Sequence, residues 1–149
     1  MTATEPQDRA DFAARLIRLS HAGRPQELPD LATFEGPPSL TRTSLRVDRL
    51  AKFCPSTGRP DQFSVQVTYA PADGRCLELD SLVRHLEAYQ SVAVSAEVLA
   101  DQLAIAVLAQ TLALWVEVTV HQTGREGAEI QVTARHERDT TLADRPAIP

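Results

Sequence analysis

The chain has 149 residues and a formal net charge of −5. This length favours a single domain with its own hydrophobic core and is short for two. Acidic residues outnumber basic ones 20 to 15, which argues against a general nucleic-acid binder, because phosphate neutralisation requires clustered cations. A small molecule is therefore the easier partner to expect.

No apolar run approaches the roughly 20 residues that a membrane span needs, and the first residues lack the basic and apolar regions of a signal peptide. Cys54 and Cys76 are too few for a disulfide framework, and the histidines have no metal-ligand spacing. We therefore expect a cytoplasmic protein with no membrane partner and no metal site.

The first 39 residues are predicted to form an N-terminal arm. Apolar positions at helical spacing in residues 11–19 predict a short helix. The prolines and the glycine of residues 24–39 favour an irregular extended segment after it. Phe34 and Glu35 are expected to lie in a surface loop, with packing on a neighbouring subunit as the alternative.

The next segment predicts a β-hairpin. Leu45, Val47 and Leu50 indicate a strand within residues 40–53. Residues 63–69 alternate cleanly between apolar and polar side chains, as a half-buried strand does. Residues 71–74, Pro-Ala-Asp-Gly, are typical of a turn that ends this strand.

Two helices and a second hairpin follow. Residues 78–89 show an amphipathic helical pattern, and Ser95 is a candidate N-cap of a second helix with Glu97 in its first turn. A carboxylate there is favoured by the helix dipole even without a ligand. Residues 114–121 and 127–134 predict two alternating strands, and residues 135–149 a disordered tail.

The predicted fold class is therefore α+β, with a four-stranded antiparallel sheet and two helices on one of its faces. The domain is expected to span residues 40–134.

One short motif carries the candidate chemistry. Residues 54–61 read Cys-Pro-Ser-Thr-Gly-Arg-Pro-Asp. The two prolines fix φ and Gly58 allows a tight reversal, so Cys54 and Asp61 are predicted to be held on either side of a rigid turn. A preorganised thiol and acid suit addition to a polarised carbon. The competing interpretation is that Cys54 is an inert core thiol.

This motif and the strand after it resemble the QueF family of nitrile-processing enzymes. The resemblance continues through Leu77-Glu78-Leu79 and Glu97 and covers residues 40–134. It implies the tunnelling fold, in ββααββ order, whose subunits assemble into an oligomeric barrel. It also implies a substrate, 7-cyano-7-deazaguanine or a nucleic acid carrying it, and a place in queuosine- or archaeosine-type modification.

The resemblance assigns a role to each matching residue. Cys54 would attack the nitrile carbon to give a covalent thioimide, and Asp61 would give a proton to the nitrile nitrogen. Glu97 would anchor the purine-like ring, and the segment of Leu77, Glu78 and Leu79 would line the base.

Departures from the family's reductases bear on the second half of the reaction. Asp80, Val83, His85 and Gln90 stand where the reductases carry lysines, an aromatic residue and an arginine associated with NADPH. A nicotinamide phosphate needs cationic partners. We therefore favour ammonia addition, as in the amidinotransferase branch, over NADPH-dependent reduction.

Ala96 replaces the histidine that precedes the family's Glu, which keeps an inactive purine- or pterin-binding protein as a second alternative. Among the remaining reactive residues, Cys76 is expected to be a small packed residue and His85 a solvated one. Lys52 is the chain's only lysine.

Overall fold

The computed structural model describes residues 25, 27–55, 57–124 and 127–138. The helix predicted at residues 11–19 and most of the predicted C-terminal tail lie outside these residues. The described elements, in chain order, are β1 Thr33–Glu35, β2 Thr43–Phe53, β3 Pro60–Tyr69, β4 Arg75–Leu77, α2 Leu79–Glu87, the 3-10 helix η1 Ala88–Ser91, α3 Ala96–Thr111, β5 Trp115–Thr123 and β6 Glu129–Glu137.

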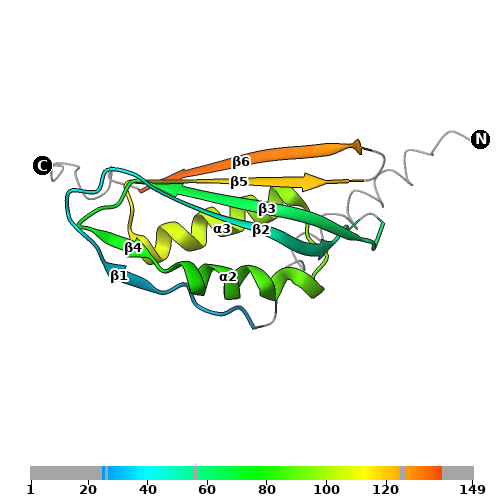
Figure 1. Ribbon diagram of the computed structural model, residues 1–149, viewed down its shortest axis with the longest axis horizontal. Coiled ribbons are helices and arrows are strands. Elements are labelled where there is room, and N and C mark those ends of the chain that lie inside the picture. The colour runs from blue at the N-terminus through cyan, green and yellow to red at the C-terminus, as the bar shows by residue number, and fades with distance from the viewer. Residues whose placement is uncertain (1–24, 26, 56, 125–126, 139–149) are drawn as a thin grey trace, which may run out of the picture.

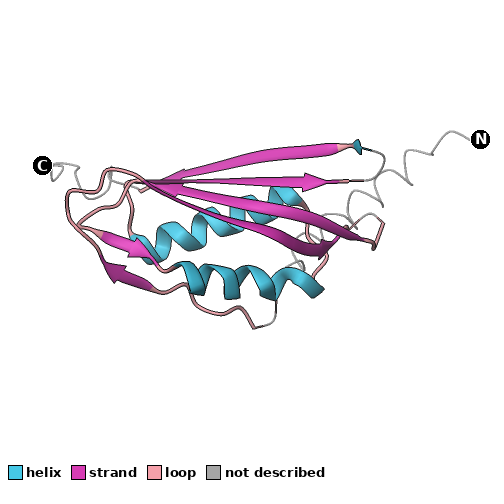
Figure 2. Ribbon diagram, viewed as in Figure 1, coloured by secondary structure: helices cyan, strands magenta, loops and turns pink. Residues whose placement is uncertain are grey.

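The main sheet has four antiparallel strands in the order β2-β3-β5-β6, which confirms the predicted α+β architecture. Both helices lie on the same face of it (Figures 1 and 2). Alternate residues of β3 and β5 point into the layer between sheet and helices, because successive side chains of a strand face opposite ways. The buried valines of these strands are Val65, Val67, Val116, Val118 and Val120.

The prediction that Phe34 and Glu35 lie in a loop is wrong. These residues belong to β1, which pairs with β4 in a separate two-stranded sheet. The pairing is continued by Gly36 N, which donates to Gly74 O at 2.7 Å. Gly74 has φ +73, and a Cβ on it would lie 2.5 Å from Gly36 O. The turn predicted at residues 71–74 therefore brings the N-terminal arm against β4.

The helix boundaries follow local signals. Ser95 caps α3 as predicted, with its Oγ accepting from Val98 N at 3.2 Å. Leu112 ends this helix in the left-handed conformation at φ 53. The helix predicted over residues 78–89 is shorter, since α2 ends at Glu87 and the chain tightens into η1.

The last strand is longer than predicted. β6 continues past residue 134 to Glu137, because Arg135–Glu137 pair with Trp115–Glu117 at the start of β5. Arg135 of β6 also stacks on Trp115 of β5, with Cζ 4.6 Å from the ring centroid.

Among the helices of the described ranges, none is long and apolar enough to span a bilayer.

A β-bulge divides β2 into two halves. Val47 faces Val65 and Leu50 faces Phe63, so three steps on β2 match two steps on β3. Arg49 takes up the extra residue with φ 61. A strand has a side-chain period of two, so one inserted residue moves every later side chain to the opposite face. Beyond the bulge Leu50 and Lys52 are therefore buried against the helix layer.

Candidate active site

Two backbone hydrogen bonds close the hairpin turn that carries the motif, and both involve Cys54. Cys54 N donates to Arg59 O, and Gly58 N donates to Cys54 O, each at 2.8 Å. Gly58 has a positive φ of +68, which is the conformation expected of it in a tight reversal. Cys54 therefore continues the β2–β3 ladder by one residue, on the same face of the strand as Lys52.

Cys54 and Asp61 line one pocket of about 620 Å³. The turn residues Thr57, Arg59 and Pro60 form one wall. The end of β5 forms another wall with Gln122, Thr123 and Gly124. The structure thus brings the predicted thiol and acid into one cavity, which the tip of the hairpin and the neighbouring strand enclose together.

Asp61 is oriented by a residue that the sequence reading missed. Gln122 Nε2 donates to Asp61 Oδ2 at 3.0 Å, while Gln122 Oε1 is buried with no partner in the described residues. A side-chain amide has a donor NH₂ and an acceptor oxygen. If the Gln122 amide rotated by half a turn, its Oε1 would accept a hydrogen bond from a protonated Asp61 carboxyl. A neutral partner of this kind suits a carboxyl group that must give up and regain a proton.

Lys52 is a second residue of the site that the motif did not indicate as functional. It lies directly opposite Asp61 in the β2–β3 ladder and is 1% exposed. Burial lowers the pKa of its ammonium from the usual 10.5, and the nearby Asp61, Cys54 and Glu97 oppose that shift. The only lysine of the chain is thus buried beside the candidate nucleophile and acid.

Glu97 is brought towards the turn by a short parallel bridge. Phe53 N donates to Val92 O and Val94 N donates to Phe53 O, each at 3.3 Å, so the end of β2 is fastened to the segment that leads into α3. Glu97 lies in the first turn of this helix and is exposed. The bridge therefore places the start of α3 at the same end of the molecule as Cys54.

The predicted base-lining segment lies at the other end. Leu77 is the last residue of β4, and its N donates to Tyr69 Oη at 2.7 Å. Glu78 N donates to Ala32 O, and Leu79 is 48% exposed at the start of α2. Figure 1 shows β4 and the β2–β3 turn at opposite ends of the sheet. Within one chain these residues do not meet Cys54.

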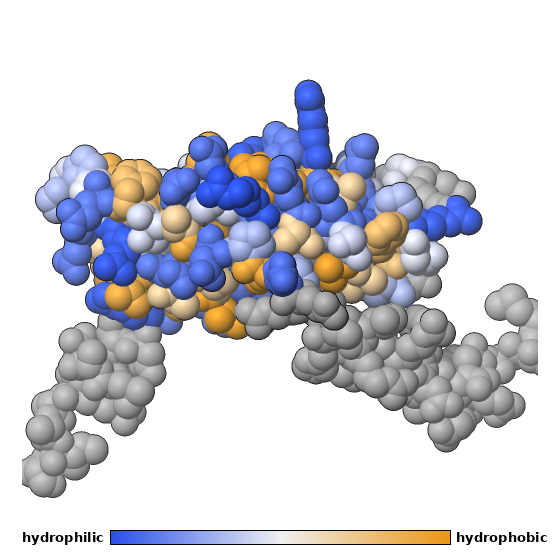
Figure 3. Space-filling view, turned by 90° about the horizontal axis from the view of Figure 1, so that it is seen from below, coloured by the Kyte–Doolittle hydropathy of each residue, from blue (hydrophilic) through white to orange (hydrophobic). Residues whose placement is uncertain are grey.

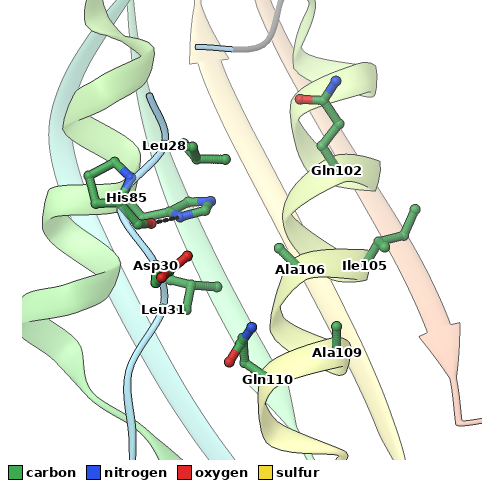
Figure 4. A pocket seen from close by; sticks show the side chains of 10 residues that line it. Leu28, Asp30, Leu31, His85, Gln102, Ile105, Ala106, Ala109 and Gln110 are labelled. Carbon is green, nitrogen blue, oxygen red and sulfur yellow. Dashed lines mark hydrogen bonds between the residues drawn. The ribbon is translucent and has the colours of Figure 1, made fainter. Parts of the chain in front are cut away.

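A second pocket, of about 350 Å³, lies between α2, α3 and the segment from Leu28 to Leu31 (Figure 4). His85 lines it, and the prediction that this side chain is solvated is wrong, because it is 4% exposed and its Nδ1 lies 2.7 Å from Pro29 O. The arm packs across α2 and covers the ring. Cys76 is buried, as predicted.

The described residues include no group of three or more His, Cys, Asp or Glu side chains arranged to hold a metal ion. The candidate site contains the Cys54 thiol, the Asp61 carboxyl and the Gln122 amide, with the Lys52 amine buried nearby.

A four-stranded antiparallel sheet whose first hairpin and last hairpin are separated by two helices on one face is the arrangement of a tunnelling-fold unit. A family model described as QueF-like protein matches residues 60–141. The NADPH-dependent 7-cyano-7-deazaguanine reductase of Anaeromyxobacter sp. (strain K) is 30% identical over 109 residues, which are 72% of this chain and 88% of that protein. The reductase of the same name from Thioalkalivibrio sulfidiphilus is 31% identical over 113 residues, or 74% and 87%.

A solved structure has the same fold. The apo crystal structure of the archaeosine synthase QueF-Like matches with a TM-score of 0.60 and 28% identity, over 65% of this chain and 94% of that chain. The chain belongs to the QueF-like family. Its relatives are thus named for two activities, a reduction of 7-cyano-7-deazaguanine and the synthesis of archaeosine.

Proposed function

We propose that this protein acts on the nitrile of 7-cyano-7-deazaguanine, either free or carried in a nucleic acid, through a thioimide on Cys54. The observation that supports this most strongly is the shared pocket, in which Cys54 and Asp61 face one cavity and Gln122 orients the carboxyl. The names of the relatives supply the substrate class.

The first step needs a nucleophile and a proton donor. The Cys54 thiolate adds its electron pair to the nitrile carbon and forms a C–S bond. One π pair of the C≡N bond takes the proton from the Asp61 carboxyl, whose O–H bond breaks. The products are a neutral thioimide and an ionised Asp61. A nitrile is a weak electrophile, so attack and proton transfer must be coupled.

Recognition of the heterocycle is proposed to involve two subunits. Glu97 lies in the first turn of α3, just after the segment that is bridged to Phe53, and would anchor the ring, whereas Leu77, Glu78 and Leu79 lie at the opposite end of the same chain. A homo-oligomer would bring these two ends together. The outer edges of β2 and β6 are unpaired in the described part of the chain, and pairing with another copy would remove these open edges.

The residues of α2 and η1 do not fit NADPH in the manner of the family's reductases. Asp80 adds a negative charge, Val83 has no polar atom, and Gln90 is uncharged. His85 is buried and lies 2.7 Å from Pro29 O. Phosphate groups bind to cationic side chains. We therefore propose that ammonia, rather than a hydride, adds to the thioimide, which gives an amidine and returns the Cys54 thiol.

Reduction is the alternative, and the names of the curated relatives favour it. The two outcomes differ in mass and in cofactor use. An inactive binding protein, the remaining alternative, would form no covalent adduct.

The decisive experiment measures the intact mass of the protein after incubation with the nitrile. We expect an adduct equal to the mass of the nitrile in the natural protein and none in Cys54→Ala, while Cys76→Ala keeps the adduct. Ammonium is then expected to release the amidine. Nicotinamide absorbance that falls on addition of NADPH would show reduction instead, and a natural protein without an adduct would contradict the proposal.

A further inference from the structure

Lys52 is the most unusual buried residue of the described structure. Its side chain is 1% exposed, and Nζ has no hydrogen-bond partner there. Burying an amine without a partner costs free energy, and an apolar side chain of similar size would fill the same space. Stability therefore gives no reason for a lysine at this position.

The backbone explains how Lys52 comes to face the site. The bulge at Arg49 turns the last residues of β2 over, so that Lys52 points into the helix layer opposite Asp61. Cys54 follows two residues later on the same face, where Cα atoms are roughly 6–7 Å apart. The four-carbon stem of a lysine is long enough to bring Nζ to the sulfur.

An aromatic ring and three ionisable groups lie around Nζ. It lies 5.9 Å from the centroid of the Phe63 ring. The groups that affect its charge are Asp61 from β3, Cys54 from the turn and Glu97 from α3. The uncharged Gln122 of β5 contacts one of these groups, since its Nε2 donates to Asp61 Oδ2.

We propose that Lys52 is the general base for Cys54, taking the proton of the thiol and, as the resulting ammonium ion, stabilising the thiolate. The S–H bond of Cys54 breaks, and the lone pair of the Lys52 amine binds the proton. The thiolate then attacks, Asp61 gives its proton to the nitrile nitrogen, and the site ends with a Lys52 ammonium facing an Asp61 carboxylate. Charge is conserved throughout.

The lowered pKa of Lys52 is consistent with this role. An amine with its usual pKa is protonated at neutral pH and has no lone pair to offer, whereas burial favours the neutral form. Once the thiolate forms, the attraction between opposite charges in a partly buried site favours the ammonium. This inference rests on the proposed function only in taking Cys54 as the nucleophile.

The test measures the reactivity of the thiol without any nitrile. Alkylation of the full chain by iodoacetamide is followed as a function of pH, with Cys54 and Cys76 distinguished by peptide mass. We expect the Cys54 rate to have its inflection below the ordinary thiol pKa of about 8.5. In Lys52→Met the inflection should return to about 8.5 or higher, and the rate at pH 7 should fall at least about 10-fold.

Two further variants complete the design. Lys52→Arg keeps a positive charge and should give an inflection nearer to the natural protein than to Lys52→Met. Arg46→Met, an exposed position on the same strand, should leave the profile unchanged. An inflection that is the same in the natural protein and Lys52→Met, or one at 8.5 or higher in the natural protein, would overturn the proposal.

The outcome separates this inference from the proposed function. A nitrile adduct with a Lys52-independent thiol profile would remove only the role of Lys52. A Lys52-dependent profile without a nitrile adduct would support the base and contradict the nitrile chemistry.

Discussion

Gln122 donates a hydrogen bond to Asp61 from the neighbouring strand, with Nε2 3.0 Å from Oδ2. Phe63, two residues after Asp61, is the residue that pairs with Gln122 in the ladder, so the contact runs diagonally across the same face of the sheet. The amide holds the carboxyl towards the cavity that Cys54 also lines.

Asp61→Asn should slow formation of the nitrile adduct by about 10²–10⁴-fold, because an amide cannot give the nitrogen a proton. Alkylation of Cys54 by iodoacetamide should remain, since it needs no proton donor. Quenched time points analysed by intact mass measure the rate of adduct formation, and peptide mass measures the rate of Cys54 alkylation. Asp80→Asn, on exposed α2, is the matched control. An unchanged adduct rate in Asp61→Asn would contradict the role of the acid.

Gln122→Leu should reduce the adduct rate by about 3–10-fold, the value of one ordinary hydrogen bond to the reacting group. The same change at Gln131, which is exposed on β6, should have no effect. The measurement is the rate of mass increase at a saturating concentration of the nitrile. Equal rates in the two variants would show that the contact between Gln122 and Asp61 does not matter for catalysis.

Lys52→Met should raise the free energy of unfolding at neutral pH by on the order of 1 kcal/mol, because it removes a buried unpartnered amine. The folded pKa of Lys52 is lower than the unfolded 10.5, so the unfolded chain binds more protons between these two values. The natural protein should therefore gain stability relative to the variant as pH rises towards 10.5. Urea unfolding across this range measures the difference, and a gap that is independent of pH would refute it.

Arg49 adopts a left-handed conformation that a β-branched residue disfavours. Arg49→Val should cost about 1–2 kcal/mol of unfolding free energy, whereas Arg49→Gly should be neutral or stabilising. Arg46→Val, an exposed position before the bulge, should cost little. Thermal unfolding of the three variants compares them, and equal losses at positions 46 and 49 would argue against the bulge geometry.

Tyr69→Phe should lower the free energy of unfolding by about 1–3 kcal/mol, because it leaves the buried Leu77 N without its acceptor. Tyr89→Phe removes a side-chain contact to Gln102 and should cost less, about 0.5–1.5 kcal/mol. Urea unfolding gives both values. A smaller loss at Tyr69 than at Tyr89 would mean that β4 does not depend on this hydrogen bond.

The surface of the helix layer also bears on assembly. Apolar side chains lie interspersed among polar ones over this face (Figure 3). Leu79 and Ile105, from α2 and α3, are about half exposed, at 48% and 50%. Leu79 belongs to the segment that the proposed function assigns to an interface between subunits.

Local patterns in the sequence determined most of the architecture. The alternation of residues 63–69 and of the second hairpin predicted the strands, and Ser95 predicted the start of α3, because burial on one face and N-capping each depend on nearby residues. The motif from Cys54 to Asp61 likewise predicted a turn that both residues flank. These features need no information about the rest of the chain.

Only the tertiary structure decided which residues share the site. The bulge at Arg49 reverses the faces of β2, and an arginine with positive φ has no signature in a sequence, so strict alternation from Val47 would have put Cys54 and Lys52 on the outer face. Gln122 comes from a strand 61 residues away from Asp61 in the chain. The length of the sheet separates Glu78 from Cys54. Each of these depends on how strands pair, which is a property of the whole fold.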